Sequence, residues 1–185
     1  MIKIETGTVH PSRNAVFVAF YAEPTHLYQT NPDCKKWGEQ AWYAKVALLG
    51  VMMRWDGSLG FVGGSVDPNE SLIEAVIREV KEETDYDVTS DMLVPVCSHL
   101  MTEGKEKHTH LFAVKLSVEQ MYEMRNAQSN AWHGRVESSG MNIVHMVPDA
   151  PNYLLANSWA GTAKQELEIL LQSGLLPEAV FEKND

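Results

Sequence analysis

The chain has 185 residues, which is long enough for one well-buried domain, and its composition of 44% hydrophobic and 22% charged residues is typical of a globular protein. Its formal net charge of −10 argues against broad electrostatic binding to a nucleic-acid backbone, although it leaves room for a local basic pocket. We therefore expect one domain that spans residues 1–185.

Cysteine content and apolar runs bear on the cellular compartment. The sequence has two cysteines, Cys34 and Cys97, which are too few for a disulfide framework and favour a reducing cytosol. The first residues lack the apolar run of a signal peptide, and no apolar run reaches the roughly 18 residues of a membrane span. We expect a cytoplasmic protein with no membrane partner.

The first half of the chain predicts strands that lead to a pair of glycines. Residues 15–22 form an apolar run typical of a buried strand, and residues 44–54 predict a second strand. The Asp-Gly pair at residues 56–57 is a strong hairpin signal. Residues 58–62 are therefore expected to pair back on the second strand and to lead into the glycine pair at residues 63–64.

Residues 23–40, between these strands, predict a loop because they include prolines, an asparagine and a glycine. Trp37 lies in this segment and Trp42 follows it. Packing in a core or in a dimer interface is one interpretation of the two indoles, and stacking on a nucleobase is the other.

After the glycine pair the sequence predicts a helix with two different faces. Asp67 is expected to cap this helix, with Pro68 at the first helical position and Glu70 completing a capping box. The apolar face is expected to consist of Ile73, Val76, Ile77 and Val80, and the acidic face of Glu79, Glu82 and Glu83.

The acidic face has two interpretations. Like charges at this spacing destabilise a helix by a few tenths of a kcal/mol per pair, and a solvated face relieved by Arg78 and Lys81 is one interpretation. The other is a metal site. Converging carboxylates are what Mg²⁺ or Mn²⁺ requires beside a phosphate, because both ions prefer hard oxygen ligands.

The rest of the chain predicts a mixture of strands and helices. Strands are expected at residues 92–98, 108–116 and 141–147, helices at residues 118–128 and 159–172, and a loop at residues 129–140. Strands with helices before and after them indicate an α/β sandwich with a mixed central sheet.

The spacing of residues around the acidic helix resembles the Nudix box. Its fixed positions are matched by Gly64, Glu70, Arg78, Glu79, Glu82 and Glu83, with Val80 in a hydrophobic position. Six residue types in register arise by chance in a chain of this length on the order of once in a hundred thousand. The family has glycine where this chain has Asp85, a residue type that tolerates the left-handed conformation expected there.

The resemblance continues outside the box. Residues 54–67 and 156–164 are similar to a branch of the Nudix family, the animal hydrolases that decap small nucleolar RNA and hydrolyse inosine diphosphates, and the similarity covers most of residues 15–176. It implies a Nudix-type α/β/α sandwich and hydrolysis of a diphosphate linkage in a nucleoside diphosphate derivative. The implied substrate is either a small nucleotide or the cap of an RNA.

The resemblance implies metal ligands for Mg²⁺ or Mn²⁺. Glu79 and Glu83 are implied as the principal ligands, and Glu82 as a further ligand or a base that orients water. The main-chain carbonyl of Gly63 is implied as another contact with the metal. Relatives also have an aspartate before a His-Gly pair, and Glu137 is the nearest replacement for it in this chain.

The resemblance implies supporting roles for other residues. Arg78 is expected to orient a box glutamate by bidentate hydrogen bonding, and Glu70 to act as a cap and a supporting partner. His99 and His110 also match the relatives, and we interpret them as structural histidines. His108 shares one strand face with His110, but too few partners lie nearby to predict zinc.

Five residues are expected to contact the substrate. Arg54 and Phe61 match family positions that contact the nucleotide, and we place Gly64 with them. Phe17 and Glu166 stand where relatives have a histidine and a glutamine. Phe17 and Phe61 are expected to sandwich a base, Arg54 to hold a phosphate or a base carbonyl, and Glu166 to favour a base that offers N–H donors.

Two other functions fit the same residues. One is an ADP-ribose or dinucleotide pyrophosphatase, which would share the metal chemistry. The other is a catalytically silent Nudix module that binds nucleotide or RNA, and the intact Arg78, Glu79, Glu82 and Glu83 argue against it. The resemblance and the five tryptophans predict a homodimer.

Overall fold

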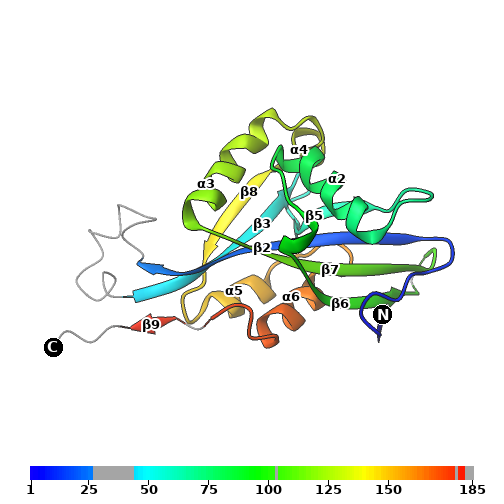
Figure 1. Ribbon diagram of the computed structural model, residues 1–185. Coiled ribbons are helices and arrows are strands. Elements are labelled where there is room, and N and C mark those ends of the chain that lie inside the picture. The colour runs from blue at the N-terminus through cyan, green and yellow to red at the C-terminus, as the bar shows by residue number, and fades with distance from the viewer. Residues whose placement is uncertain (27–43, 103, 178, 182–185) are drawn as a thin grey trace.

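The structure is a computed structural model that describes residues 1–26, 44–102, 104–177 and 179–181 (Figure 1). Its strands are β1 (Ile2–Ile4), β2 (Asn14–His26), β3 (Ala44–Arg54), β4 (Leu59–Gly60), β5 (Val62–Ser65), β6 (Leu93–Met101), β7 (Lys107–Leu116), β8 (Ser138–His145) and β9 (Val180–Phe181). Its α-helices are α2 (Leu72–Thr84), α3 (Val118–Ala127), α4 (Trp132–Glu137), α5 (Ala150–Ala156) and α6 (Ala163–Gln172). Two short 3-10 helices are η3 (Ser90–Met92) and η4 (Gln128–Asn130).

The strands of the described residues form one mixed sheet. Their order is β1-β6-β7-β2-β3-β4, with β5 also paired to β2, and β8 and β9 also paired to β3. β2 and β7 are parallel, in a register that runs from Asn14–His108 to Ala22–Leu116, whereas β2 and β3 are antiparallel. Helices α2, α3 and α4 cover one face of this sheet, and α5 and α6 cover the other (Figure 1). The expected α/β/α sandwich is confirmed.

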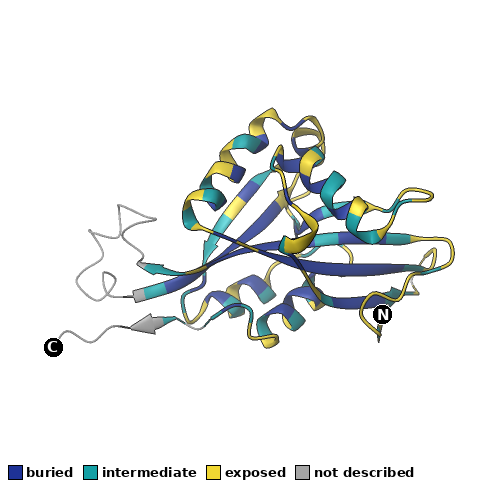
Figure 2. Ribbon diagram, viewed as in Figure 1, coloured by how far each residue is buried: buried dark blue, intermediate teal, exposed yellow. Residues whose placement is uncertain are grey.

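The sheet has a cluster of buried apolar side chains on each face, and the alternation of side chains along β2 explains why. Side chains of successive strand residues point to opposite faces of a sheet. Val18 and Phe20 are buried in one apolar cluster with Val80 of α2, and Ala19 is buried in a second cluster with Leu167 of α6. The central strands are buried along most of their length, while the outer faces of the helices are exposed (Figure 2).

The predicted start of the acidic helix is wrong. α2 begins at Leu72, and its cap is Ser71, whose hydroxyl accepts the N–H of Glu74 while the Glu74 carboxylate accepts the N–H of Ser71. This is a complete capping box four residues after the predicted one. The predicted end is confirmed, because Asp85 follows the helix in the left-handed conformation with φ +53°.

Other element boundaries also differ from the predictions. The expected loop at residues 129–140 is wrong, since it contains η4, α4 and the start of β8, and α5 was not predicted at all. β2 continues to His26, so the predicted loop at residues 23–40 begins too early. Cys34, Trp37 and Trp42 lie outside the described residues. In the part of the chain that the structure describes, no helix is long and apolar enough to cross a membrane.

Candidate active site

The glycine pair lies in β5 and brings the main chain against the acidic face of α2. The N–H of Gly63 donates a hydrogen bond of 3.1 Å to Oε2 of Glu83. A Cβ atom at Gly64 would lie 2.6 Å from Oε1 of Glu79, which is closer than non-bonded atoms approach. Glycine at this position therefore leaves the space that the Glu79 carboxylate occupies.

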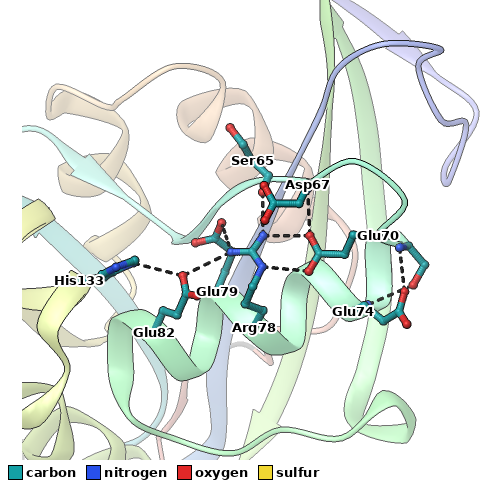
Figure 3. Close-up of polar contacts among 9 residues, drawn as sticks. Ser65, Asp67, Glu70, Glu74, Arg78, Glu79, Glu82 and His133 are labelled. Atoms are coloured by element: carbon teal, nitrogen blue, oxygen red, sulfur yellow. Dashed lines mark hydrogen bonds and ion pairs between the residues drawn. The ribbon is translucent and has the colours of Figure 1, made fainter.

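Arg78 connects the carboxylates along the helix (Figure 3). Its Nε and Nη2 donate to the two oxygens of Glu70 at 2.9 Å each, which makes a bidentate pair. Its Nη1 donates to Oε1 of Glu79 at 2.9 Å and to Oε2 of Glu82 at 3.3 Å. Nη2 also donates to the carbonyl oxygen of Ser65 at 2.9 Å. Hydrogen bonding to Arg78 lowers the pKa of Glu70, so this carboxylate is ionised and holds the guanidinium in place.

Glu79 and Glu83 are buried carboxyl groups in a cluster of like charge. Burial raises the pKa of Glu83 to about 8; the N–H of Gly63 opposes this rise, and the charges of Glu137 and Glu79 add to it. Burial also raises the pKa of Glu79, against the effect of Arg78. Both groups are therefore held where a positive charge would stabilise their ionised forms.

Helix α4, which the sequence analysis missed, carries two further residues to this face of α2. Its last residue is Glu137, and its Gly134 packs so close to α2 that a Cβ atom there would lie 2.1 Å from the carbonyl oxygen of Glu83. Nδ1 of His133 lies 3.1 Å from Oε2 of Glu82 (Figure 3). No sequence pattern indicates this His133–Glu82 pair, because it depends on how two helices pack.

A cavity of about 220 Å³ opens beside this cluster. The predicted site residues that line it are Phe17, Arg54, Phe61, Gly63, Glu83, Glu137 and Glu166. The predicted residues Gly64, Arg78, Glu79 and Glu82 do not line it, and they lie beside it in the network around Arg78. Lys107 of β7 also lines the cavity and was not predicted.

The two predicted aromatic residues reach the cavity from different segments of the chain. Phe17 lies in β2, and Phe61 lies between β4 and β5. The ring of Phe61 packs on that of Trp159, with centroids 5.6 Å apart. Trp159 therefore fixes the orientation of Phe61 from the side of the α6 layer.

Glu166 lines the same cavity from α6, on the other face of the sheet from α2 (Figure 1), and is fully buried. Its Oε1 accepts a hydrogen bond of 2.8 Å from the hydroxyl of Thr162, while its Oε2 has no partner among the described residues. Burial raises the pKa of Glu166 to about 7, and the hydroxyls of Thr162 and Thr109 and the charge of Lys107 oppose that rise. A buried oxygen without a partner is costly, and a ligand N–H would satisfy it.

The carboxylates of this site suit a metal ion by their donor type and charge, although they are not arranged around one point. Among the residues that the structure describes, no group of three or more His, Cys, Asp or Glu side chains is arranged as a set of metal ligands. The negative charges of Glu137 and Glu79 nevertheless add to the raised pKa of Glu83, and those of Glu82 and Glu137 add to the raised pKa of Glu79. Hard oxygen donors that repel one another are what a divalent cation neutralises, so the donor set fits Mg²⁺ or Mn²⁺.

The histidines that match the relatives lie in the sheet, away from this cluster. His110 is buried, with Nδ1 2.8 Å from the hydroxyl of Ser98 and Nε2 3.3 Å from the side-chain oxygen of Asn14. Burial lowers the pKa of His110 to about 4, so the ring is neutral. His108 lies near it on the same strand, with ring centroids 6.2 Å apart.

Comparisons with known sequences identify the family. Residues 26–176 match the family described as "Nudt16-like: U8 snoRNA-decapping enzyme-like". The chain is 30% identical over 166 residues to a Xenopus laevis U8 snoRNA-decapping enzyme, a match that covers 83% of this chain and 76% of the relative. It is 38% identical over 85 residues to a U8 snoRNA-decapping enzyme of Homalodisca vitripennis, covering 44% of this chain and 45% of the relative.

A third relative carries a different description. The chain is 30% identical over 144 residues to a Tudor-interacting repair regulator protein of Gallus gallus, covering 69% of this chain and 43% of the relative. The matched segments thus span less than half of the Homalodisca vitripennis and Gallus gallus proteins.

Solved structures show the same fold at low sequence identity. A mutT/nudix family protein from Listeria innocua superposes with a TM-score of 0.55 at 15% identity, covering 89% of this chain and 94% of that one. The NUDIX domain of Shewanella oneidensis NrtR superposes with a TM-score of 0.53 at 14% identity, covering 86% of each chain. Fold, box residues and sequence match agree, and the chain belongs to the Nudt16-like family of Nudix hydrolases.

Proposed function

We propose that this chain hydrolyses the diphosphate linkage of a nucleoside diphosphate derivative and releases a mononucleotide, with Mg²⁺ or Mn²⁺ as cofactor. The observation that carries the proposal is the buried pair Glu79 and Glu83, whose pKa values are raised beside the cavity that Arg54 lines. Nudix enzymes generally use divalent metal ions, and raised carboxylate pKa values in a cavity mark candidate catalytic sites.

Glu79, Glu83 and Glu137 would hold the cation, with the carbonyl of Gly63 and with Glu82 as further contacts. When bound, the cation supplies charge neutralisation to the diphosphate and lowers the pKa of the attacking water. The protein supplies the positions of its ligands: the N–H of Gly63 holds Glu83, and Nη1 of Arg78 holds Glu79. Glu82, between Arg78 and His133, is placed to orient water or to accept its proton.

The opposite end of the cavity would bind the base. Phe17 and Phe61 offer aromatic surfaces for stacking, and the free Oε2 of Glu166 would accept a hydrogen bond from a base N–H. Arg54, which also lines the cavity, would bind a phosphate oxygen between these two ends. Guanine and hypoxanthine present a ring N–H for this role, so we propose a preference for them.

The relatives bear on the size of the substrate. Two of them are named as U8 snoRNA-decapping enzymes, which supports an RNA cap as the physiological substrate. An ADP-ribose or dinucleotide pyrophosphatase would use the same cation chemistry on a small molecule. A silent binding module is the reading that the name of the Gallus gallus relative favours, and the carboxylates held by Arg78 argue against it. A cytoplasmic homodimer remains a prediction of the sequence.

A product assay tests the proposal. Purified chain is incubated with Mg²⁺ or Mn²⁺ and with inosine and guanosine diphosphates, their deoxy forms, ADP-ribose, NAD and capped RNA. We expect a mononucleotide product that disappears in Glu79→Gln and persists in Glu74→Gln, a glutamate-to-glutamine change on the exposed side of the same helix. Absence of product from every substrate with both cations would replace this proposal with the binding module.

A further inference from the structure

A second hollow lies next to the first cavity on the side of α4. Its volume is about 500 Å³, and its lining includes Trp55, Arg125, Arg135 and Ser138. Ser138 lines both spaces, and it is paired with Arg54 in the register of β8 on β3. The two spaces therefore adjoin at Ser138, where the ends of these two strands pair.

The second hollow presents an aromatic surface that is fixed and yet exposed. Trp55 has 66% of its surface exposed, although its indole N–H donates to the carbonyl oxygen of Arg135 at 3.3 Å. Trp132 is 68% exposed and is not part of this lining, but the guanidinium of Arg135 lies 6.0 Å from its ring centre. A tryptophan anchored at its edge with its ring open to solvent is a surface on which a base can stack.

The charge of the hollow is opposite to that of the whole chain. The ionisable side chains in its lining are the exposed Arg125 and Arg135, both cationic, in a protein of formal net charge −10. Arg54 adds a third arginine where the two spaces meet. Exposed arginines beside an exposed indole suit the phosphates and bases of a single-stranded nucleic acid.

The size of the first cavity leaves part of a large substrate outside it. Its 220 Å³ is below the roughly 300–1,000 Å³ of typical small-molecule sites, so we expect a nucleoside diphosphate joined to a further group to extend beyond it. We propose that the second hollow binds the first nucleotides of a single-stranded RNA whose 5′ diphosphate linkage occupies the first cavity. This inference rests on the proposed function and deepens it, because it names the surface that would hold the RNA beyond the cleaved linkage.

A binding experiment without divalent cation tests the surface apart from hydrolysis. Fluorescence anisotropy would measure the affinity of the full chain for a short single-stranded RNA at several salt concentrations. We expect Trp55→Ala to weaken binding about tenfold and Trp55→Phe, which keeps an aromatic face, to retain most of the affinity. Arg125→Ala and Arg135→Ala are each expected to weaken binding and to reduce the slope of log affinity against log salt by about 0.7.

Lys115→Ala is the matched control, because it also removes one exposed positive charge but lines neither space. It is expected to bind RNA like the wild type. Equal affinities of wild type, Trp55→Ala and Arg135→Ala would overturn the inference, as would an equal loss in Lys115→Ala. A change of mass in sedimentation for Trp55→Ala with unchanged RNA affinity would also overturn it, and would assign this surface to contacts between copies of the chain.

The same preparations are assayed for hydrolysis of a small nucleoside diphosphate substrate. A wild type that binds RNA through Trp55 but hydrolyses nothing would contradict the proposed function and leave the RNA surface standing. If the wild type hydrolyses small substrates, but Trp55→Ala and Trp55→Phe bind RNA equally well, the RNA surface would be contradicted and the proposed function would stand.

Discussion

Glu83 and Glu166 are two buried carboxyl groups that line one cavity from two helices, Glu83 at what we call the α2 end and Glu166 at the α6 end. Burial is the main reason that the pKa of each is raised, but the groups around them differ. Glu83, on α2, has a pKa of about 8 because it is buried and because Glu137 and Glu79 add negative charge around it. Glu166, on α6, has a pKa of about 7 because burial outweighs the hydrogen bonds with Thr162 and Thr109 and the charge of Lys107.

The difference indicates what each end of the cavity requires from a ligand. Repulsion among carboxylates is relieved by a cation, which a neutral donor cannot replace. A single bare oxygen such as Oε2 of Glu166 is satisfied by one N–H group. A metal-bound diphosphate attached to a base would satisfy the α2 end and the α6 end together.

The largest expected effect is the loss of the cation at the α2 end. Glu83→Gln removes one charge from the cluster without changing its volume, and we expect kcat to fall at least about a hundredfold. Mg²⁺ is also expected to raise the Tm of the wild type and not that of Glu83→Gln, since binding stabilises the folded state. Glu74→Gln should keep both properties; if Glu83→Gln kept its Mg²⁺ response, the carboxylate would not be a ligand.

The next effect concerns the support of that cluster by Arg78. Arg78→Lys keeps the charge but loses the bidentate pair with Glu70 and the separate bond to Glu79. We expect unfolding free energy to fall by about 1–3 kcal/mol and kcat to fall about tenfold or more, since these are charge-assisted hydrogen bonds. Urea unfolding and steady-state kinetics measure the two effects. An unchanged kcat would show that Arg78 serves stability alone.

A smaller effect is expected at the α6 end, and it depends on pH. The pKa of Glu166 is raised from an ordinary value of 4.5 to about 7, so the folded state loses stability as pH rises from about 4.5 through 7. Glu166→Gln removes this dependence. We expect it to be more stable than the wild type by about 1–2 kcal/mol at pH 8, because part of the gain is offset by an amide group without an acceptor.

The comparison of wild type and Glu166→Gln below pH 4.5 is the control for that prediction. The wild-type carboxyl is then protonated in both folded and unfolded states, so the advantage of Glu166→Gln at pH 8 should vanish. An advantage of equal size at both pH values would mean that packing, and not ionisation, separates the two proteins.

The smallest expected effect lies outside the cavity. Asp85 is in the left-handed conformation at the end of α2, and Asp85→Gly relieves its strain but removes an exposed ion pair with Lys81. We expect a net gain in unfolding free energy of about 0.5 kcal/mol and no change in kcat. A fall in kcat for Asp85→Gly would show that this departure from the Nudix box affects the chemistry.

Local patterns predicted the parts of the site that lie on one element. The spacing of Glu79, Glu82 and Glu83 placed these residues on one face of a helix, and the preceding glycine pair was expected beside them. The carboxylate of Glu70 does accept the N–H of Asp67 at 2.9 Å while it also binds Arg78. The predicted cap is nevertheless wrong, because the helix begins only at Leu72 and is capped by Ser71 and Glu74.

Tertiary packing decided the rest. α4 is short and contains Gly134, a residue type that disfavours helices, so its sequence predicted a loop. The contact of His133 with Glu82 follows from the docking of α4 on α2. The complete burial of Glu166 depends on α6 lying against the sheet, and neither helical spacing nor composition signals it.

The most direct test of the two-ended cavity is the ratio of kcat/KM for a guanosine and an adenosine diphosphate substrate, measured in wild type, Glu83→Gln and Glu166→Gln. We expect Glu83→Gln to lower both values and keep the ratio, and Glu166→Gln to change the ratio, by about tenfold for one hydrogen bond. A ratio unchanged by Glu166→Gln, or changed by Glu83→Gln, would contradict the assignment of the cation to the α2 end and the base to the α6 end.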